Sequence, residues 1–193
     1  MKNSGTVRME TKRLVLRPFV IEDAGAMFRN WANDPQVTKF LSWEPHKDVE
    51  ETKKILEGWI ASYESKDFYT WAIAWREDEG NVIGSIAVPQ LNQKAGRVTV
   101  GYCLGRKWWG NGIMKEAFAE LIRFFFEVEG ANRVEALHDI RNVNSGKVMM
   151  ACGLKKEGTL RQYGWNNQGI CDECIYGMVA SDYFEGKQRW ENK

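Results

Sequence analysis

A glycine-rich loop between a strand-like run and a predicted helix holds the residues best suited to chemistry. The loop lies within Gly101 to Glu116, reads G-Y-C-L-G-R-K-W-W-G-N-G-I-M-K-E, and includes two basic side chains, Arg106 and Lys107. The first backbone N–H groups of a helix have no intrahelical partner, and the helix dipole adds partial positive charge there. Glycines let several of these N–H groups converge on one point. The stretch is therefore suited to bind phosphate or pyrophosphate.

Two common phosphate motifs do not fit this spacing. The Walker motif requires Lys and then Ser or Thr after its second glycine, but Asn111 follows Gly110. The dinucleotide fingerprint requires a third glycine three residues after the second, and Lys115 stands there. A nucleotide-dependent oxidoreductase is therefore a weak alternative. For this loop alone, an ordinary turn between strand and helix is also open.

The elements that must position the loop follow from hydrophobic periodicity. Strands are predicted at Lys12 to Phe19, Tyr69 to Arg76, Val82 to Val88, Arg97 to Leu104, Arg133 to Leu137, Lys155 to Tyr163 and Cys174 to Val179. Helical stretches are predicted from Glu22 to about Asn33, around Val37 to Leu41, and at Asp48 to Ser65, Ile113 to Val128 and Ser145 to Cys152. This order predicts an α/β (α+β) fold with one sheet.

Length and charge limit the classes of function. The 193 residues predict a single domain, with a core from about residue 10 to 180 and short polar termini. Lys and Arg number 27 against 26 Asp and Glu, so no broad field favours nucleic acid or a membrane surface. No segment approaches the roughly 20 apolar residues of a membrane helix. Met1 to Arg8 lacks a signal-peptide hydrophobic region, so we expect a cytoplasmic protein.

The cysteines and histidines do not predict a metal site. Cys171 and Cys174 form a single C-x-x-C, whereas a structural zinc needs a second pair of ligands. The two histidines, His46 and His138, lie far from that pair in sequence. We expect reduced thiols on a late strand and no metal.

The glycine loop resembles the acetyl-CoA loop of the GNAT acetyltransferase superfamily. The family pattern is Arg or Gln, two residues, Gly, one residue, and Gly or Ala; here Lys107 to Gly112 match it, with Lys in place of Arg or Gln. Asn142 to Leu154, N-V-N-S-G-K-V-M-M-A-C-G-L, resembles the second family signature at the expected distance. Thr11 to Pro18, Trp31 to Pro35 and Trp108 to Ala117 resemble the RimJ/RimL-like branch, the ribosomal-protein N-terminal acetyltransferases.

This resemblance implies a fold and a cofactor site. The fold would be a single mixed, mostly antiparallel sheet of about seven strands, flanked by helices, with strands 4 and 5 splayed apart. The pantetheine arm of acetyl-CoA would pair with the main chain of Tyr102, Cys103 and Leu104. Asn142 would hold the arm from the opposite side. The pyrophosphate would lie on the loop, with cofactor contacts from Lys107, Trp109, Gly110, Asn111, Gly112 and Ile113.

The resemblance also implies catalytic roles. The backbone N–H of Leu104 would stabilise the oxyanion. Many family members carry a Tyr as thiolate acid where this chain has Met149, which cannot donate a proton. In the RimL-like branch the acid is a Ser, here Ser145, although a cap on the helix N-terminus is the alternative role. The base stays open between a water relay and the titratable residues Glu44, His46, His138, Asp172 and Glu173.

The acceptor pocket in this branch lies between the first helices and the last hairpin. It would take the aromatic residues Trp31, Phe40, Trp43, Tyr69, Trp71 and Trp165, each with core packing as the alternative. We expect an acetyl-CoA-dependent N-acetyltransferase acting by direct transfer on a primary amine, either a protein N-terminus or a small molecule. The alternative is a non-catalytic acyl-CoA-binding module of the same fold. A monomer and a homodimer are both compatible with the sequence.

Overall fold

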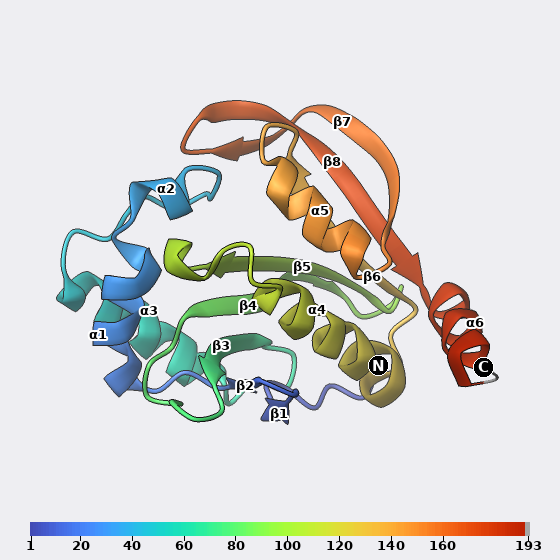
Figure 1. Ribbon diagram of the computed structural model, residues 1–193, viewed down its shortest axis with the longest axis horizontal. Helices are drawn as coiled ribbons and strands as arrows, with labels where there is room; N and C mark the ends of the chain where they lie inside the picture. The colour runs from blue at the N-terminus through green and yellow to red at the C-terminus, as the bar shows by residue number, and fades with distance from the viewer. Residues whose placement is uncertain (192–193) are drawn as a thin grey trace.

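A computed structural model describes residues 1–191 and contains one eight-stranded sheet in the order β1-β2-β3-β4-β5-β6-β8-β7 (Figure 1). Only β5 and β6 are parallel, so the predicted mixed, mostly antiparallel sheet is confirmed. The strands are β1 (Met9–Glu10), β2 (Leu14–Arg17), β3 (Thr70–Trp75), β4 (Gly84–Asn92), β5 (Arg97–Leu104), β6 (Arg133–Asp139), β7 (Lys155–Asn166) and β8 (Gly169–Val179). The strand beyond the expected seven is β1, whose two residues are too short to give a periodic signal.

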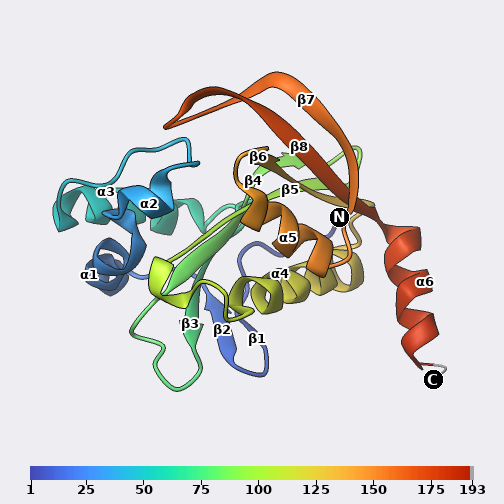
Figure 2. The same cartoon turned by 45° about the horizontal axis from the view of Figure 1, so that its top comes forward.

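Helices cover both faces of the sheet (Figures 1 and 2). On one face lie α4 (Ile113–Arg123), its continuation η4 (Phe124–Glu129) and α5 (Val143–Ala151). On the other lie η1 (Ile21–Asp23), α1 (Ala24–Met27), η2 (Phe28–Ala32) and α3 (Val49–Ser62), with the short α2 (Pro35–Thr38) beside them. A last helix, α6 (Ala180–Glu191), was not predicted; Tyr183 anchors it by stacking on Phe126.

Local sequence signals explain where the main helices begin and end. The Asp48 side chain accepts a hydrogen bond from the Glu51 N–H and so caps α3. Gly130 has φ +69° and ends η4 in the left-handed conformation that glycine adopts most readily. The predicted helix from Ile113 to about Val128 is therefore confirmed as α4 and η4 together.

Each face of the sheet packs its own hydrophobic core. The larger core joins the sheet to α4, η4 and α5, and centres on Trp71, Phe118 and Phe125. The smaller core joins the other face to α1, η2 and α3, around Trp31 and Leu56. The sheet is therefore held rigidly from both sides.

The ladder between β5 and β6 is short. It pairs only Arg97–Val100 of β5 with 133–136 of β6, and ends at Val100 and Ala136. Beyond that point β5 continues to Leu104 on β4, and β6 continues to Asp139 on β8. The predicted splay of these two strands is confirmed, and we call this gap the open seam.

The hairpin of β7 and β8 arches across the molecule toward α2 (Figure 1). At its tip, the Asn167 side chain donates to the carbonyls of Thr38 (2.9 Å) and Trp43 (2.7 Å). The Asn167 N–H donates to the Leu41 carbonyl at 3.1 Å. These three bonds tie the tip of the hairpin to the loop after α2.

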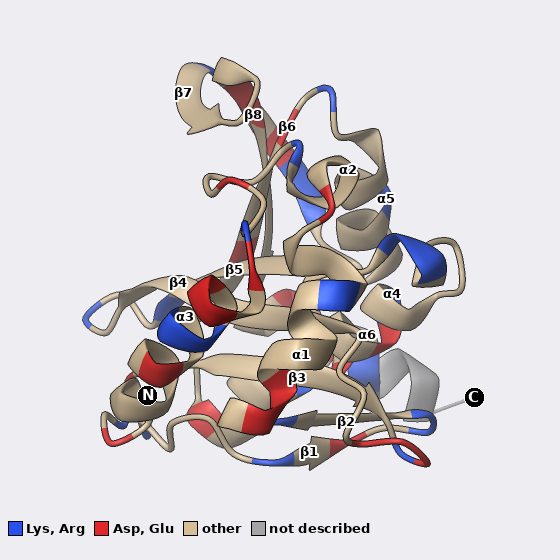
Figure 3. Cartoon of the chain, turned by 90° about the vertical axis from the view of Figure 1, so that its left-hand side faces the viewer, with Lys and Arg blue, Asp and Glu red and all other residues tan. Residues whose placement is uncertain are grey.

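Acidic and basic residues alternate over the elements in the view of Figure 3, in agreement with the balanced net charge of +1. Within residues 1–191, no helix combines the length and the apolar character that a bilayer crossing requires.

Candidate functional site

The end of β5 directs main-chain groups into the open seam. Gly105 donates its N–H to the Ile83 carbonyl at 2.9 Å, so Gly105 faces the neighbouring β4 side. In an antiparallel pair, alternate residues bond to the same neighbour. Cys103 therefore shares the orientation of Gly105, whereas Tyr102 and Leu104 point their N–H and C=O groups toward β6. Since β6 has already diverged, an extended ligand could meet the Tyr102 N–H and C=O and the Leu104 N–H, whereas the Leu104 C=O accepts from the Trp109 indole.

The glycine loop leaves several N–H groups available. Gly110 and Gly112 have φ +78° and +70°, a left-handed conformation in which other residues are strained. Within residues 1–191, the N–H groups of Gly110, Asn111 and Gly112 have no acceptor. Ile113 then opens α4, and its side chain is buried. The loop thus presents donors at a helix N-terminus, the arrangement that binds phosphate groups.

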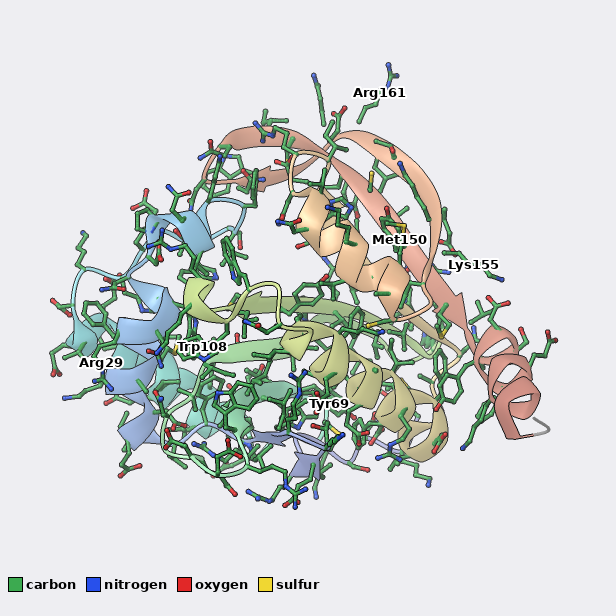
Figure 4. The ribbon with its side chains drawn as sticks, in the orientation of Figure 1. Arg29, Tyr69, Trp108, Met150, Lys155 and Arg161 are labelled. Atoms are coloured by element: carbon green, nitrogen blue, oxygen red, sulfur yellow. The ribbon has the colours of Figure 1, made fainter. Side chains whose placement is uncertain are left out.

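Three loop side chains hold this conformation or extend from it. The Trp109 indole donates to the Leu104 carbonyl at 2.7 Å, which joins the loop to the end of β5. The Asn111 amide donates to the Trp109 carbonyl at 3.1 Å. Lys107 is exposed, with its ammonium 5.5 Å from the centre of the Trp108 ring. Trp108 is labelled in Figure 4.

A half-buried anchor under the loop was missed by sequence reasoning. Glu116, in the first turn of α4, accepts from the Thr11 hydroxyl (2.6 Å), the Arg13 N–H (2.9 Å) and the Arg13 Nε (2.6 Å). Burial alone would raise the pKa of Glu116, but these hydrogen bonds outweigh it and lower that pKa. Arg13 also donates to the Asn111 carbonyl at 3.2 Å. The start of α4 is therefore fixed to β2. The only sequence signal is a glutamate in a first helical turn.

The first turn of α5 faces β5 across the open seam. The Tyr102 hydroxyl donates to the Ser145 carbonyl at 3.0 Å, and burial raises the pKa of Tyr102 well above its usual range. Within residues 1–191, neither the Ser145 hydroxyl nor the Asn142 side chain has a partner, and Asn142 at the N-cap position makes no cap bond. The cap role considered for Ser145 therefore has no hydrogen bond to support it. Met149, which belongs to the same helix, is buried.

The six predicted aromatic residues fall into two groups. Trp31, Tyr69 and Trp71 are 0–1% exposed, and Tyr69 and Trp71 pack edge-on against Phe124 (Figure 4 labels Tyr69). We correct the prediction for these three, because side chains without accessible surface present nothing to an acceptor. Trp31 lies in η2, as the predicted helix implied, and Trp71 lies in the predicted strand, but which side of a helix or strand packs into the core depends on tertiary contacts.

Phe40, Trp43 and Trp165 remain accessible. Phe40 and Trp43 are half-buried in the loop that Asn167 holds, and Trp165 is exposed on the hairpin. The tie between loop and hairpin brings segments more than 120 residues apart in sequence to one side of the sheet.

The five candidate bases differ in environment. Glu44 is exposed, and Asp172 accepts from the Gln162 N–H. His46 lies against Trp43 with Nδ1 2.8 Å from the Thr52 hydroxyl, and burial lowers its pKa. Burial and the nearby Asp139 raise the pKa of Glu173. His138 is 8% exposed, on β6 beyond the last pair with β5.

The two cysteines of the C-x-x-C pair point to opposite faces of β8, because residues three apart on a strand alternate. Cys171 accepts from the Asn166 side chain, whereas Cys174 lies near the Thr159 hydroxyl in the larger core. Among the side chains that the structure describes, no three from His, Cys, Asp or Glu are placed to hold a metal.

The arrangement fits an acyl-CoA. Free N–H groups at Gly110 to Gly112 suit a diphosphate. The unpaired main chain of Tyr102 and the unpaired N–H of Leu104 suit an extended amide-containing arm. His138 adds a buried ring nitrogen, Nε2, that has no hydrogen-bond partner.

Comparisons with known proteins agree with this geometry. The family described as acetyltransferase (GNAT) domain matches residues 13–155. An uncharacterised N-acetyltransferase of Bacillus subtilis, YoaA, is 32% identical over 89% of this chain and 96% of its own length. The ribosomal protein uS5-alanine N-acetyltransferase of Escherichia coli is 27% identical over 96% of this chain and 97% of its own length.

A solved structure adds the fold. RimL, a ribosomal-protein N-acetyltransferase in complex with coenzyme A, superimposes with a TM-score of 0.80 at 19% identity, over 91% of this chain and 99% of its own. The family match covers more than half of the sequence, and the open seam and glycine loop lie within it. The chain belongs to the GNAT acetyltransferase family, with RimJ/RimL-like ribosomal-protein acetyltransferases among its relatives.

Proposed function

We propose that this protein transfers the acetyl group of acetyl-CoA directly to a primary amine in a ternary complex. The observation that carries the proposal is the open seam. Pairing of β5 and β6 stops at Val100 and Ala136. The glycine loop, which begins directly after Leu104, folds back onto that strand end through the Trp109 indole. A ligand with a diphosphate at one end and an extended arm would meet unpaired donors along its length.

In this proposal the cofactor contacts are mostly main-chain. The N–H groups of Gly110, Asn111, Gly112 and Ile113 hold the diphosphate, and exposed Lys107 adds charge. The main chain of Tyr102 and the N–H of Leu104, on either side of the β4-facing Cys103, pair with the pantetheine arm. Two further side chains take part, Asn142 from the α5 side and Trp109 through its hold on the Leu104 carbonyl.

Two groups would carry the chemistry. The Leu104 N–H, directed into the open seam, stabilises the oxyanion that forms when the amine attacks. The Ser145 hydroxyl, which lacks an intramolecular partner within residues 1–191, donates a proton to the leaving thiolate. Ser145 is held near the seam by the bond from Tyr102 to its carbonyl.

The acceptor is proposed to be a protein N-terminal amine or a small-molecule amine, bound on the side walled by Phe40, Trp43 and Trp165. The E. coli relative that acts on an alanine of a ribosomal protein favours the first. A non-catalytic acyl-CoA-binding module is the second candidate, because buried Met149 lacks the proton donor that many family members carry there. Either a monomer or a homodimer could perform these functions.

The test combines binding with turnover. Calorimetry should show micromolar binding of acetyl-CoA, and a thiol-release assay with small amines and alanine-ended peptides should show turnover with one class. Failure of the folded protein to bind any acyl-CoA would refute the proposal. Binding without turnover on every amine would favour the binding module.

Ser145→Ala gives a sharper test of the assigned acid. We expect kcat to fall by about 100-fold, in the range of one lost acid–base group, with the Kd for acetyl-CoA unchanged. An unchanged kcat would remove Ser145 from the mechanism while leaving the transferase activity in place.

A further inference from the structure

His138 carries a buried ring nitrogen that makes no hydrogen bond within the described residues. Its Nδ1 lies 2.7 Å from the Asp139 carbonyl oxygen. A carbonyl only accepts, so Nδ1 must carry the proton. Nε2 of the neutral ring is then a bare lone pair, and within residues 1–191 it has no partner. Buried polar groups almost always find one, so this exception needs an explanation.

The position of the ring places this lone pair at the open seam. His138 follows the last β6 residue that pairs with β5, Ala136, by two positions. Alternation along the strand puts both side chains on the face covered by α4 and α5. There the ring meets the first turn of α5: a Cβ at Gly146 would lie only 2.7 Å from Nε2. The glycine at 146 therefore permits the imidazole to lie directly beside Ser145.

The groups that face the ring from the neighbouring elements are phenols and a thiol rather than charged side chains. Tyr176 and Cys174 come from β8, with the Tyr176 ring centre 5.5 Å from that of His138 and Cys174 directly opposite on the ladder. Tyr102 comes from β5 through its bond to Ser145. The Asp139 carboxylate is held by Arg141 and Asn166 on the other face. Within the described residues, then, no carboxylate or ammonium bonds to Nε2.

We propose that His138 Nε2 contacts the thiol sulfur of bound CoA and relays a proton from the acceptor amine to the departing thiolate. The inference rests on the proposed acetyl transfer and supplies the base that sequence reasoning left open. It also supplies a proton donor for the thiolate, which Met149, at the position where many family members carry a Tyr, cannot be. In this assignment Nε2, rather than the Ser145 hydroxyl assigned above, gives the thiolate its proton, and the Ser145→Ala and His138→Asn variants decide between the two donors.

The proton count closes without a further reactant. As the amine nitrogen bonds to the acetyl carbon, an N–H bond breaks and Nε2 takes the proton. As the C–S bond breaks, the sulfur keeps the electron pair and takes that proton from Nε2. The ring returns to its starting tautomer, held throughout by the Asp139 carbonyl.

The first test needs no variant of His138. The chain has only two histidines, so ¹⁵N-histidine labelling gives few signals, and His46→Gln assigns them. His46 is the internal control, because its Nδ1 is occupied by Thr52. CoA should shift the His138 Nε2 resonance, and desulfo-CoA, which lacks only the sulfur, should leave it near the ligand-free position. Equal shifts from both ligands, or none from either, would overturn the proposal.

The second test is kinetic. Asn at 138 retains an N–H near the Nδ1 position but removes Nε2. On an amine that the wild type acetylates, His138→Asn should lower kcat by about 100-fold or more, with the Kd for acetyl-CoA within about twofold. Unchanged kcat would overturn the relay, whereas a wild type that binds no acyl-CoA would overturn the proposed function itself.

Discussion

At the scale of single residues, the hydrogen bond from Trp109 to the Leu104 carbonyl connects the glycine loop to the proposed oxyanion donor. The indole is 46% exposed, so the fold does not need it for burial. Its role is to set the angle at which the loop leaves β5. The side chain thus affects two parts of the site through one bond.

Trp109→Phe keeps an aromatic ring and removes this donor. We expect the free energy of unfolding to fall by about 1 kcal/mol, the net value of one hydrogen bond. The Kd for acetyl-CoA should rise at the same time, because both the loop and the strand end lose their common restraint. Urea unfolding and calorimetry measure the two effects. A stability loss with an unchanged Kd would show that the loop keeps its position without the indole.

At the scale of elements, the turn into α4 can be tested with a matched pair of glycines. Gly112 and Gly130 have nearly the same φ, +70° and +69°, and a Cβ at either meets no close atom. Alanine at each should therefore cost a similar amount, about 1–2 kcal/mol, for the left-handed backbone. Only Gly112→Ala should weaken acetyl-CoA binding, since Gly130 ends η4 away from the loop.

Equal Kd values for the two variants would contradict a role of the Gly112 turn in binding. Unequal losses of stability would show instead that the turn at Gly112 has relaxed out of its left-handed form. Thermal unfolding of both variants without ligand separates these cases.

How far the sequence predicts an element depends on how local its cause is. The loop from Gly105 to Gly112 and the strand before it were predictable, because glycine spacing and strand alternation are local signals. The start of α3 at Asp48 was predictable for the same reason. The two-residue β1 and α6 lacked such signals, since one is too short and the other is held by stacking on Phe126.

The candidate site was predictable only in part. The motifs predicted where the glycine loop and the open seam lie, and the cofactor contacts assigned to them stay a prediction. The acceptor wall was assigned to six aromatic residues, but packing puts Trp31, Tyr69 and Trp71 in the cores. The partnerless Nε2 of His138 and the tie made by Asn167 depend on contacts distant in sequence. No periodicity contains that information.

At the scale of the whole molecule, Asp139 links β6, the start of α5 and the hairpin. Its carboxylate accepts from the Arg141 N–H and guanidinium and from the Asn166 side chain. The hydrogen bonds from Arg141 hold the pKa of Asp139 well below its ordinary value. A depressed folded-state pKa gives stability that is present above the unfolded value, about 3.9, and is lost as the pH falls through the folded value.

Asp139→Asn should therefore lower stability at pH 7 and pH 5 by the same amount. Below about pH 4 the difference from the wild type should shrink, because the native carboxylate then loses its advantage over the unfolded one. Urea unfolding at pH 7, 5 and 3 measures this. A difference that stays constant down to pH 3 would mean that Asp139 contributes no pH-dependent stability.

The short ladder between β5 and β6 also has a mechanical consequence. Four residue pairs at one end, and the Asn167 contacts at the other, join the part of the sheet that carries β6, β8 and β7 to the part that carries β1 to β5. Between these two joints, the bond from the Tyr102 hydroxyl to the Ser145 carbonyl crosses the seam, and a ligand lying there would add main-chain contacts where the ladder has none. Occupancy should then slow amide exchange on both sides at once, stiffening the two halves into one plate.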